Sequence, residues 1–175
     1  FGALPIDEDL IEAADDEVIS IAGGCICCSF GSDLTAALSQ LVKANPHLDH
    51  ILIEASGVAM PEAIMNSVGL LSDIVPDGIV ILADAETIQK SALDKYMSDT
   101  VLAQLKSADL LILNKVDLVT EDQVKATSTW LSLQNKTAQI IPITHSKVPP
   151  EIVLGHFSSH TYDQGVHQDV PGLST

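Results

Sequence analysis

The amino-acid sequence predicts an α/β fold, a three-layer domain in which helices cover both faces of a mainly parallel sheet. Short runs of Ile, Leu and Val alternate along the chain with stretches of helical periodicity, which is the pattern of strand–helix–strand units. Hydrophobic residues make up 46% of the sequence and aromatic residues only 3%. An aliphatic core of this kind is typical of parallel strands buried under helices. A length of 175 residues suits one domain.

Each predicted strand is a short aliphatic run that ends at a glycine, a polar residue or a turn. The five runs lie at residues 18–21, 51–53, 79–83, 110–113 and 140–143. Ligands of open α/β sheets bind at the carboxyl ends of the strands. The polar residues that follow these runs are therefore the candidates for a functional site.

The predicted helices lie between these runs and carry their own start and stop signals. Pro46 stops the first helix, and Pro61 is suited to the first position of the second. Thr120 and Gln123 have the spacing of a capping box at the start of the last helix. The helices are expected from Ser32 to Asn45, from Pro61 through Val68 to a break at 76–78, over 93–107, and from Thr120 through Leu133.

The charge of the chain excludes several classes of protein. The formal net charge is −16, from 24 acidic residues against 8 lysines and no arginine. A protein that binds nucleic acid or an anionic membrane surface by its own charge would be basic instead. No apolar run approaches the length of about 20 residues that spans a bilayer, and no signal peptide opens the sequence. We expect no nucleic-acid or membrane partner and a cytoplasmic location.

The tetrapeptide from Asn114 to Asp117 follows the fourth predicted strand and reads Asn-Lys-Val-Asp. A carboxylate accepts two parallel hydrogen bonds from the N1–H and the exocyclic amine of guanine, a pair that adenine does not offer. The asparagine can steady the loop and reach the acceptor edge of the base, and the stem of Lys115 can cover one base face. This is the N-K-x-D guanine-specificity motif of P-loop GTPases. The alternative is an ordinary polar loop between a strand and a helix.

Three cysteines lie within four positions, Cys25, Cys27 and Cys28, directly after two glycines. Three thiolates in one flexible loop can converge on a soft or borderline cation, and zinc is the default metal for such ligands, with copper(I) as the alternative. A redox relay or small buried thiols are the other interpretations. A fourth ligand would come from solvent or from one of six histidines, His47, His50, His145, His156, His160 and His167.

The second predicted strand leads into Glu54, and Gly57 follows three residues later. An acidic residue at the tip of a buried strand is suited to binding magnesium or to orienting water near a terminal phosphate. Gly57 can bring a backbone N–H close to that phosphate. By itself this signal is weak, because strands often end in glutamate.

Taken together, these motifs resemble the CobW family of P-loop GTPases. The resemblance rests on the order and separation of Gly-Cys-Ile-Cys-Cys, Ile-Glu-Ala-Ser-Gly and Leu-Asn-Lys-Val-Asp. Residues 80–85 are similar to a Val-Val-Asp-Ala strand of the family. The resemblance implies a P-loop NTPase-like fold and a metallochaperone that couples GTP binding and hydrolysis to delivery of a metal to a client protein. GTP, Mg²⁺ and Zn²⁺ are the implied cofactors.

The resemblance also implies a role for individual residues. Asn114, Lys115 and Asp117 would bind the base, and Ser146 lies in a segment, 143–147, that is similar to a loop touching guanine. Glu54 would be the catalytic residue, and Gly57 would bind phosphate. The three cysteines would hold the metal. The chain would bind GTP and GDP and a metal-requiring client, and its oligomeric state is left open.

Two departures from the family pattern qualify these expectations. No G-x-x-x-x-G-K-[ST] motif occurs in the sequence, so the phosphate-binding loop is missing. Residues 1–157 are therefore predicted to be a partial GTP-binding domain, and 158–175 a linker toward an absent C-terminal domain. We expect these 175 residues alone to hydrolyse no GTP. The alternatives are a zinc-binding module without nucleotide chemistry and an α/β scaffold that binds neither.

Overall fold

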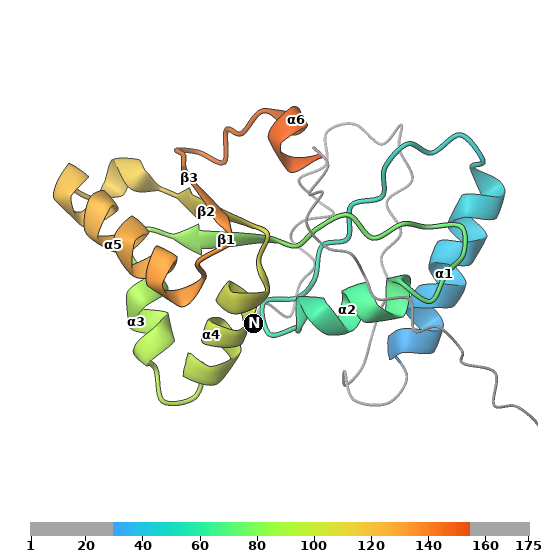
Figure 1. Ribbon diagram of the computed structural model, residues 1–175, viewed down its shortest axis with the longest axis horizontal. Coiled ribbons are helices and arrows are strands. Elements are labelled where there is room, and N and C mark those ends of the chain that lie inside the picture. The colour runs from blue at the N-terminus through green and yellow to red at the C-terminus, as the bar shows by residue number, and fades with distance from the viewer. Residues whose placement is uncertain (1–29, 155–175) are drawn as a thin grey trace, which may run out of the picture. The chain divides into compact units, whose positions relative to one another are not determined.

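The computed structural model describes residues 30–154, and the side chains from residue 34 onward (Figure 1). The chain divides into two compact units, Phe1–Pro46 and His47–Thr175. The helix α1 is the described element of the first unit, and all other described elements belong to the second. The elements are α1 (Phe30–Ala44), α2 (Pro61–Val68), β1 (Val80–Asp84), α3 (Ile88–Leu93), α4 (Ser98–Ser107), β2 (Leu110–Asn114), the 3₁₀ turn η2 (Val116–Leu118), α5 (Glu121–Gln134), β3 (Gln139–Pro142) and α6 (Pro150–Val153).

The second unit is built on a parallel sheet with the strand order β1-β2-β3, which confirms the predicted α/β class. Val80 is aligned with Leu110, and Leu110 with Gln139. Because the strand order follows the chain order, right-handed crossovers place all the connecting helices on one face of the sheet (Figure 1).

The core lies between that face and the helices α3, α4 and α5. Leu105 of α4 and Leu131 of α5 are fully buried there, together with Leu111 and Leu113 of β2. Successive side chains of a strand point to opposite faces, so alternate residues of β1 and β2 contact these helices. These helices form one of the two helical layers of the predicted three-layer fold. The parallel pairing of the strands places their three carboxyl ends at one edge of the sheet.

The sequence predicted three strands of this sheet and the capping box. The observed strands differ from the predicted ranges 79–83, 110–113 and 140–143 by one residue at one or both ends. Thr120 caps α5 as expected, since its hydroxyl accepts a hydrogen bond from the N–H of Gln123 at 3.3 Å, and its own N–H donates to the Gln123 side chain at 2.9 Å. The predicted strand at 18–21 lies outside the described residues.

The predicted strand at 51–53 is wrong, because residues 51–54 have no regular secondary structure. No strand among the described residues pairs with this run, and Leu52 is 77% exposed. An apolar run becomes a strand only where another backbone satisfies its N–H and C=O groups. The Ser56–Gly57 turn that follows is confirmed by a hydrogen bond from the Ala59 N–H to the Ser56 carbonyl at 2.8 Å.

Two predicted helices have different bounds in the structure. The helix expected over 93–107 begins only at Ser98, as α4, and residues 94–97 form a turn between it and α3, a helix that the sequence did not predict. The Asp94 carboxylate accepts hydrogen bonds from the N–H groups of Tyr96 and Met97 at 2.8 and 3.1 Å, which competes with helical hydrogen bonding. The helix that starts at Pro61 ends at Val68, before Gly69, well short of the proline expected to break it.

A buried asparagine joins α4, α5 and β3. Asn135 is 6% exposed, and its amide donates to the carbonyls of Leu105, Lys106 and Ala108 at 3.0, 3.1 and 2.8 Å. Its side-chain oxygen accepts from the N–H groups of Thr137 and Ala138 at 3.0 and 2.9 Å. One side chain therefore satisfies the last carbonyls of α4 and fixes the entry to β3.

Within the described residues, no helix combines the length and the apolar character needed to cross a membrane.

We expect Asn135→Ala to lower the free energy of unfolding by about 2–4 kcal/mol, because several buried backbone groups lose their partner at once. Asn135→Asp keeps the volume but presents a carboxylate to three carbonyls, and should destabilise the chain as well. Urea denaturation followed by circular dichroism measures both. The matched control is Gln134→Ala, which should change stability by no more than about 0.5 kcal/mol. Equal effects at positions 134 and 135 would contradict the role given to Asn135.

Candidate functional site

The carboxyl ends of the three strands are held together by backbone hydrogen bonds that continue into the loops. The N–H of Ala85 donates to the carbonyl of Asn114 at 3.0 Å, which joins the ends of β1 and β2. The N–H of Ile143 donates to Leu113 at 2.8 Å, and the N–H of Val116 donates to Ile143 at 3.3 Å. The loops that carry Asp84, Asn114 and Ser146 are therefore fixed relative to one another.

Asn114 and Ser146, which are 32 positions apart, form a reciprocal pair of hydrogen bonds. The Asn114 amide donates to the Ser146 hydroxyl at 2.8 Å, and the Asn114 side-chain oxygen accepts from the Ser146 N–H at 3.1 Å. The loop-steadying role foreseen for Asn114 is thus present in the structure. The pairing also brings together two residues that the sequence analysis predicted separately as candidates for the base site.

The loops joined by this pair have unusual backbone conformations. Lys115, His145 and Ser146 have φ angles of 61°, 51° and 52°, and they are the non-glycine residues with positive φ in the described part of the chain. L-residues rarely adopt this left-handed region, and such residues cluster at functional sites. All three lie at the carboxyl edge of the sheet, where the sequence placed the site.

Lys115 forms an ion pair with Asp84 at the end of the neighbouring strand. The Lys115 Nζ lies 2.8 Å from an Asp84 carboxylate oxygen, with the two side chains 53% and 26% exposed. The hydrogen bond from Lys115 lowers the pKa of Asp84 below its ordinary value of 3.8, and the same contact raises the pKa of Lys115 above 10.5. The pair is formed between these limits, and it contributes little to folding stability because solvent reaches both groups. It is lost as pH falls through the lowered pKa or rises through the raised one.

Asp117 is the exposed central residue of the turn η2, which begins directly after the left-handed Lys115. Among the described residues, no ion pair involves its carboxylate. A carboxylate in this position is available to accept hydrogen bonds from a ligand. The residues Asn114, Lys115, Asp117 and Ser146 therefore supply one acceptor pair, one amide and one aliphatic stem, which fits the donors and the flat face of guanine.

Glu54 and Gly57 are exposed and lie in the irregular segment before α2. Gln104 of α4 holds this segment, because its amide donates to the carbonyls of Gly57 and Ala59 at 3.1 and 2.8 Å. A Cβ atom added to Gly57 would meet nothing within 4 Å. Within residues 34–154, no hydrogen bond or ion pair connects Glu54 or Gly57 to the Asn114–Asp117 loop.

The cysteine loop, Cys25, Cys27 and Cys28, lies outside the described residues, as do His156, His160 and His167. Of the described residues, no three histidine, cysteine, aspartate or glutamate side chains gather closely enough to hold a metal ion. His47, His50 and His145 are exposed. The metal-binding hypothesis therefore depends on the cysteine loop itself.

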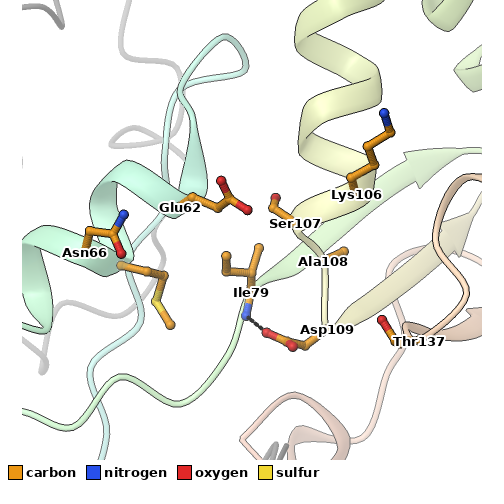
Figure 2. Close-up of a pocket in the computed structure, with 9 residues that line it drawn as sticks. Glu62, Asn66, Ile79, Lys106, Ser107, Ala108, Asp109 and Thr137 are labelled. Carbon is orange, nitrogen blue, oxygen red and sulfur yellow. Dashed lines mark hydrogen bonds between the residues drawn. The ribbon is translucent and has the colours of Figure 1, made fainter. Parts of the chain in front are cut away.

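A cavity of about 240 Å³ lies at the opposite, amino-terminal edge of the sheet. Figure 2 shows Glu62 and Asn66 of α2 on one side and Lys106, Ser107 and Asp109 on the other. The Asp109 carboxylate accepts from the Ile79 N–H at 2.8 Å, so it fastens the start of β1 to that of β2 (Figure 2). Since ligands of such sheets bind at the carboxyl ends, this cavity is not the predicted site.

Comparison with known proteins decides the family. The sequence model described as CobW/HypB/UreG, nucleotide-binding domain, matches residues 1–142. The chain belongs to this family. Membership confirms the resemblance drawn from the three motifs, and the observed parallel sheet with its flanking helices agrees with a P-loop NTPase-like domain.

Relatives of this CobW-family chain include proteins from bacteria and from a yeast. The zinc chaperone CobW of Sinorhizobium sp. is 27% identical over 89% of this chain and 52% of its own length. The zinc-regulated GTPase metalloprotein activator 1 of Schizosaccharomyces pombe is 30% identical over 76% of this chain and 33% of its own length. The zinc chaperone YjiA of Escherichia coli K12 is 28% identical over 85% and 48%. The chain spans about half the length of these relatives or less. No solved structure matches it.

Sequence reasoning missed two residues of this region. Asp84 comes directly after the predicted strand 79–83. Its pairing with Lys115 could have been inferred from two opposite charges at the ends of neighbouring parallel strands. Gln104 gave no signal, because a glutamine on a helix that contacts a loop 47 positions away is indistinguishable from a solvated one.

The pKa of Asp84 offers a test of the ion pair. Lys115→Gln should raise that pKa toward 3.8, because the hydrogen-bonded ammonium group is its largest stabilising contact. Carbon-13 NMR of the Asp84 carboxyl measures the titration directly. The control is Lys125→Gln, since Lys125 lies 4.0 Å from Asp122 and has no contact with Asp84. An unchanged titration midpoint in Lys115→Gln would contradict the ion pair.

Proposed function

We propose that this chain is the guanine-nucleotide-binding core of a GTP-dependent metallochaperone, which binds and hydrolyses GTP and delivers a metal ion, with zinc as the leading candidate, to a client protein. The observation that carries the proposal is the reciprocal hydrogen bonding of Asn114 with Ser146. These two bonds join the N-K-x-D loop to the loop after β3. Family membership and the names of the relatives, two zinc chaperones and a zinc-regulated GTPase metalloprotein activator, support the same function.

In this proposal the base binds at the carboxyl edge of β2 and β3. The Asp117 carboxylate accepts from guanine N1–H and from the exocyclic amine. Asn114 uses one amide hydrogen and its side-chain oxygen to bind Ser146. Its second amide hydrogen remains for the acceptor edge of the base. The stem of Lys115 covers one face of the ring.

The phosphates are assigned to the segment before α2. Glu54 would hold Mg²⁺ or orient the attacking water, and the N–H of Gly57 would donate to the terminal phosphate. Open space around Gly57 supports this role, because nothing lies within 4 Å of its Cβ position. Bound Mg²⁺ neutralises charge on the phosphates during transfer. Gln104 would hold this loop in place through its hydrogen bonds to the carbonyls of Gly57 and Ala59.

The metal is the cargo in this proposal, and Cys25, Cys27 and Cys28 are its ligands. Exchange of GTP for GDP would change the affinity for metal only if the two nucleotide states hold the cysteine loop differently. The client would then receive the metal from the state of lower affinity. A cytoplasmic location is part of the proposal, since three closely spaced thiols suit a reducing compartment.

The C-x-C-C run favours a second candidate function, a zinc-binding module without nucleotide hydrolysis. That function accounts for the cysteines alone. It leaves the left-handed loops and the Asn114–Ser146 pair without a purpose, so we place it second. The two candidates differ in whether guanine nucleotide binds at all.

The base assignment predicts a change of specificity on Asp117→Asn in the full-length protein. An amide donates where the carboxylate accepted, so affinity for guanine nucleotides should fall by at least about tenfold. Xanthine carries a carbonyl in place of the guanine amine, and binding of xanthosine diphosphate should rise. Fluorescence titration measures both. The exposed Asp122 on α5 provides the control variant, Asp122→Asn. Equal guanine affinity in all three proteins would remove Asp117 from the base site, and no guanine binding by any of them would favour the zinc-binding module.

The metal assignment predicts that the chain binds about one zinc ion tightly, in competition with a chromophoric chelator. Replacing Cys25, Cys27 and Cys28 together by Ser should abolish that site. Because the chain carries a net charge of −16, zinc also binds weakly to surface carboxylates. An excess of calcium occupies these carboxylates, so that the remaining zinc binding reports on the cysteines. Equal zinc affinity in the parent and in the triple variant, in the full-length protein as well as the chain, would remove the cysteines from the proposal.

A further inference from the structure

We infer that Asp84 is a positioning residue for the nucleotide base, acting through Lys115. The inference rests on the proposed function, and it adds a residue from a neighbouring strand to the base site. Three observations support it: how the carboxylate of Asp84 is held, how Lys115 is held at both ends, and how exposed the pair is.

The Asp84 carboxylate is fixed by the backbone that follows it. One oxygen, Oδ1, accepts hydrogen bonds from the N–H groups of Glu86 and Thr87 at 2.8 and 3.2 Å. This turn leaves the other oxygen, Oδ2, directed at the Lys115 Nζ at 2.8 Å. A carboxylate held by two backbone donors does not swing away with its side chain, so it is a stationary acceptor for the lysine.

Lys115 is consequently fixed at its two ends. Its backbone is in the left-handed conformation, with φ 61° and ψ 34°, and its ammonium group is bound to Asp84. Asp84 and Asn114 are aligned in the register of β1 and β2, so the lysine stem runs from the end of β2 toward the end of β1. A long side chain that is normally free to rotate is thereby ordered before any ligand arrives.

The exposure of the pair indicates what this order is for. The Lys115 side chain is 53% exposed, and solvent-exposed ion pairs contribute little to folding stability. An ordered stem with a free face is a ready surface for a flat ring. Ordering one long side chain at binding costs free energy, and Asp84 removes that cost in advance.

Asp84→Asn in the full-length protein tests the inference. The asparagine oxygen still accepts from Glu86 and Thr87, whereas its amide faces the ammonium group as a donor and cannot bind it. We expect GDP affinity to fall roughly two- to tenfold, the midpoint of urea unfolding to stay unchanged, and NMR relaxation to show the Lys115 side chain ordered in the parent and mobile in the variant. The loss of affinity should shrink at high salt, because exposed charges are screened.

Glu86→Gln is the matched control. Glu86 is exposed and acts on Lys115 by charge alone, without a side-chain hydrogen bond to it, so this variant removes one negative charge and keeps the pair. It should bind GDP as the parent does and leave Lys115 ordered. Equal losses in both variants would overturn the inference in favour of a general charge effect.

Other outcomes separate this inference from the proposed function. If the Lys115 side chain is as mobile in the parent as in Asp84→Asn, Asp84 does not position it, whether or not GDP binds. If GDP binds the parent and the variant equally, the positioning has no consequence and the inference is wrong. If the parent binds no guanine nucleotide although Lys115 is ordered by Asp84, the proposed function itself fails, and the role at the base fails with it.

Discussion

The arrangement of the second unit depends on the hydrogen bonds of the buried Asn135 side-chain amide. It satisfies carbonyls at the end of α4 and N–H groups at the start of β3 from a position at the end of α5. With that side chain in place, β3 enters the sheet at a fixed point beside β2, and α4 and α5 are held against the same face. The register of β3 on β2 then determines where the loop after β3 emerges.

The candidate site inherits its geometry from this register. Since Leu113 is aligned with Pro142, the chain leaves β3 at the level of Asn114, and Ser146 meets the asparagine amide. On the other side, the alignment of Asp84 with Asn114 brings Asp84 within reach of Lys115. The N-K-x-D loop is thus held from both neighbouring strands. The buried Asn135 at the amino-terminal edge of the sheet and the contacts of Asn114 and Lys115 at the carboxyl edge are therefore connected through the register of the strands.

Local signals in the sequence were enough to predict three strands of the sheet and the edge at which the candidate loops meet. Aliphatic runs between helices predicted β1, β2 and β3, and Thr120 with Gln123 predicted the start of α5, because these features depend on neighbouring residues. The strand at 51–53 could not be judged in this way, since a strand needs a partner backbone. Asp94 ended α3 through hydrogen bonds to its own turn, a choice that helical periodicity does not record. The contacts of Gln104 and Asn135 reach across 47 and 27 or more positions, and no local pattern announces them.

The left-handed backbone at Lys115, His145 and Ser146 has a consequence for how this protein tolerates change. Each such residue costs about 1–2 kcal/mol relative to glycine, a substantial share of the roughly 5–15 kcal/mol by which domains are stable. Glycine at position 146 would relieve that cost but remove the hydroxyl that receives the Asn114 amide. Glycine at position 115 would also relieve the backbone cost, but it would remove the lysine stem. Thermostability and the proposed nucleotide binding would therefore oppose each other at these positions, and substitutions selected only for resistance to heat would be expected to disrupt the proposed base site first.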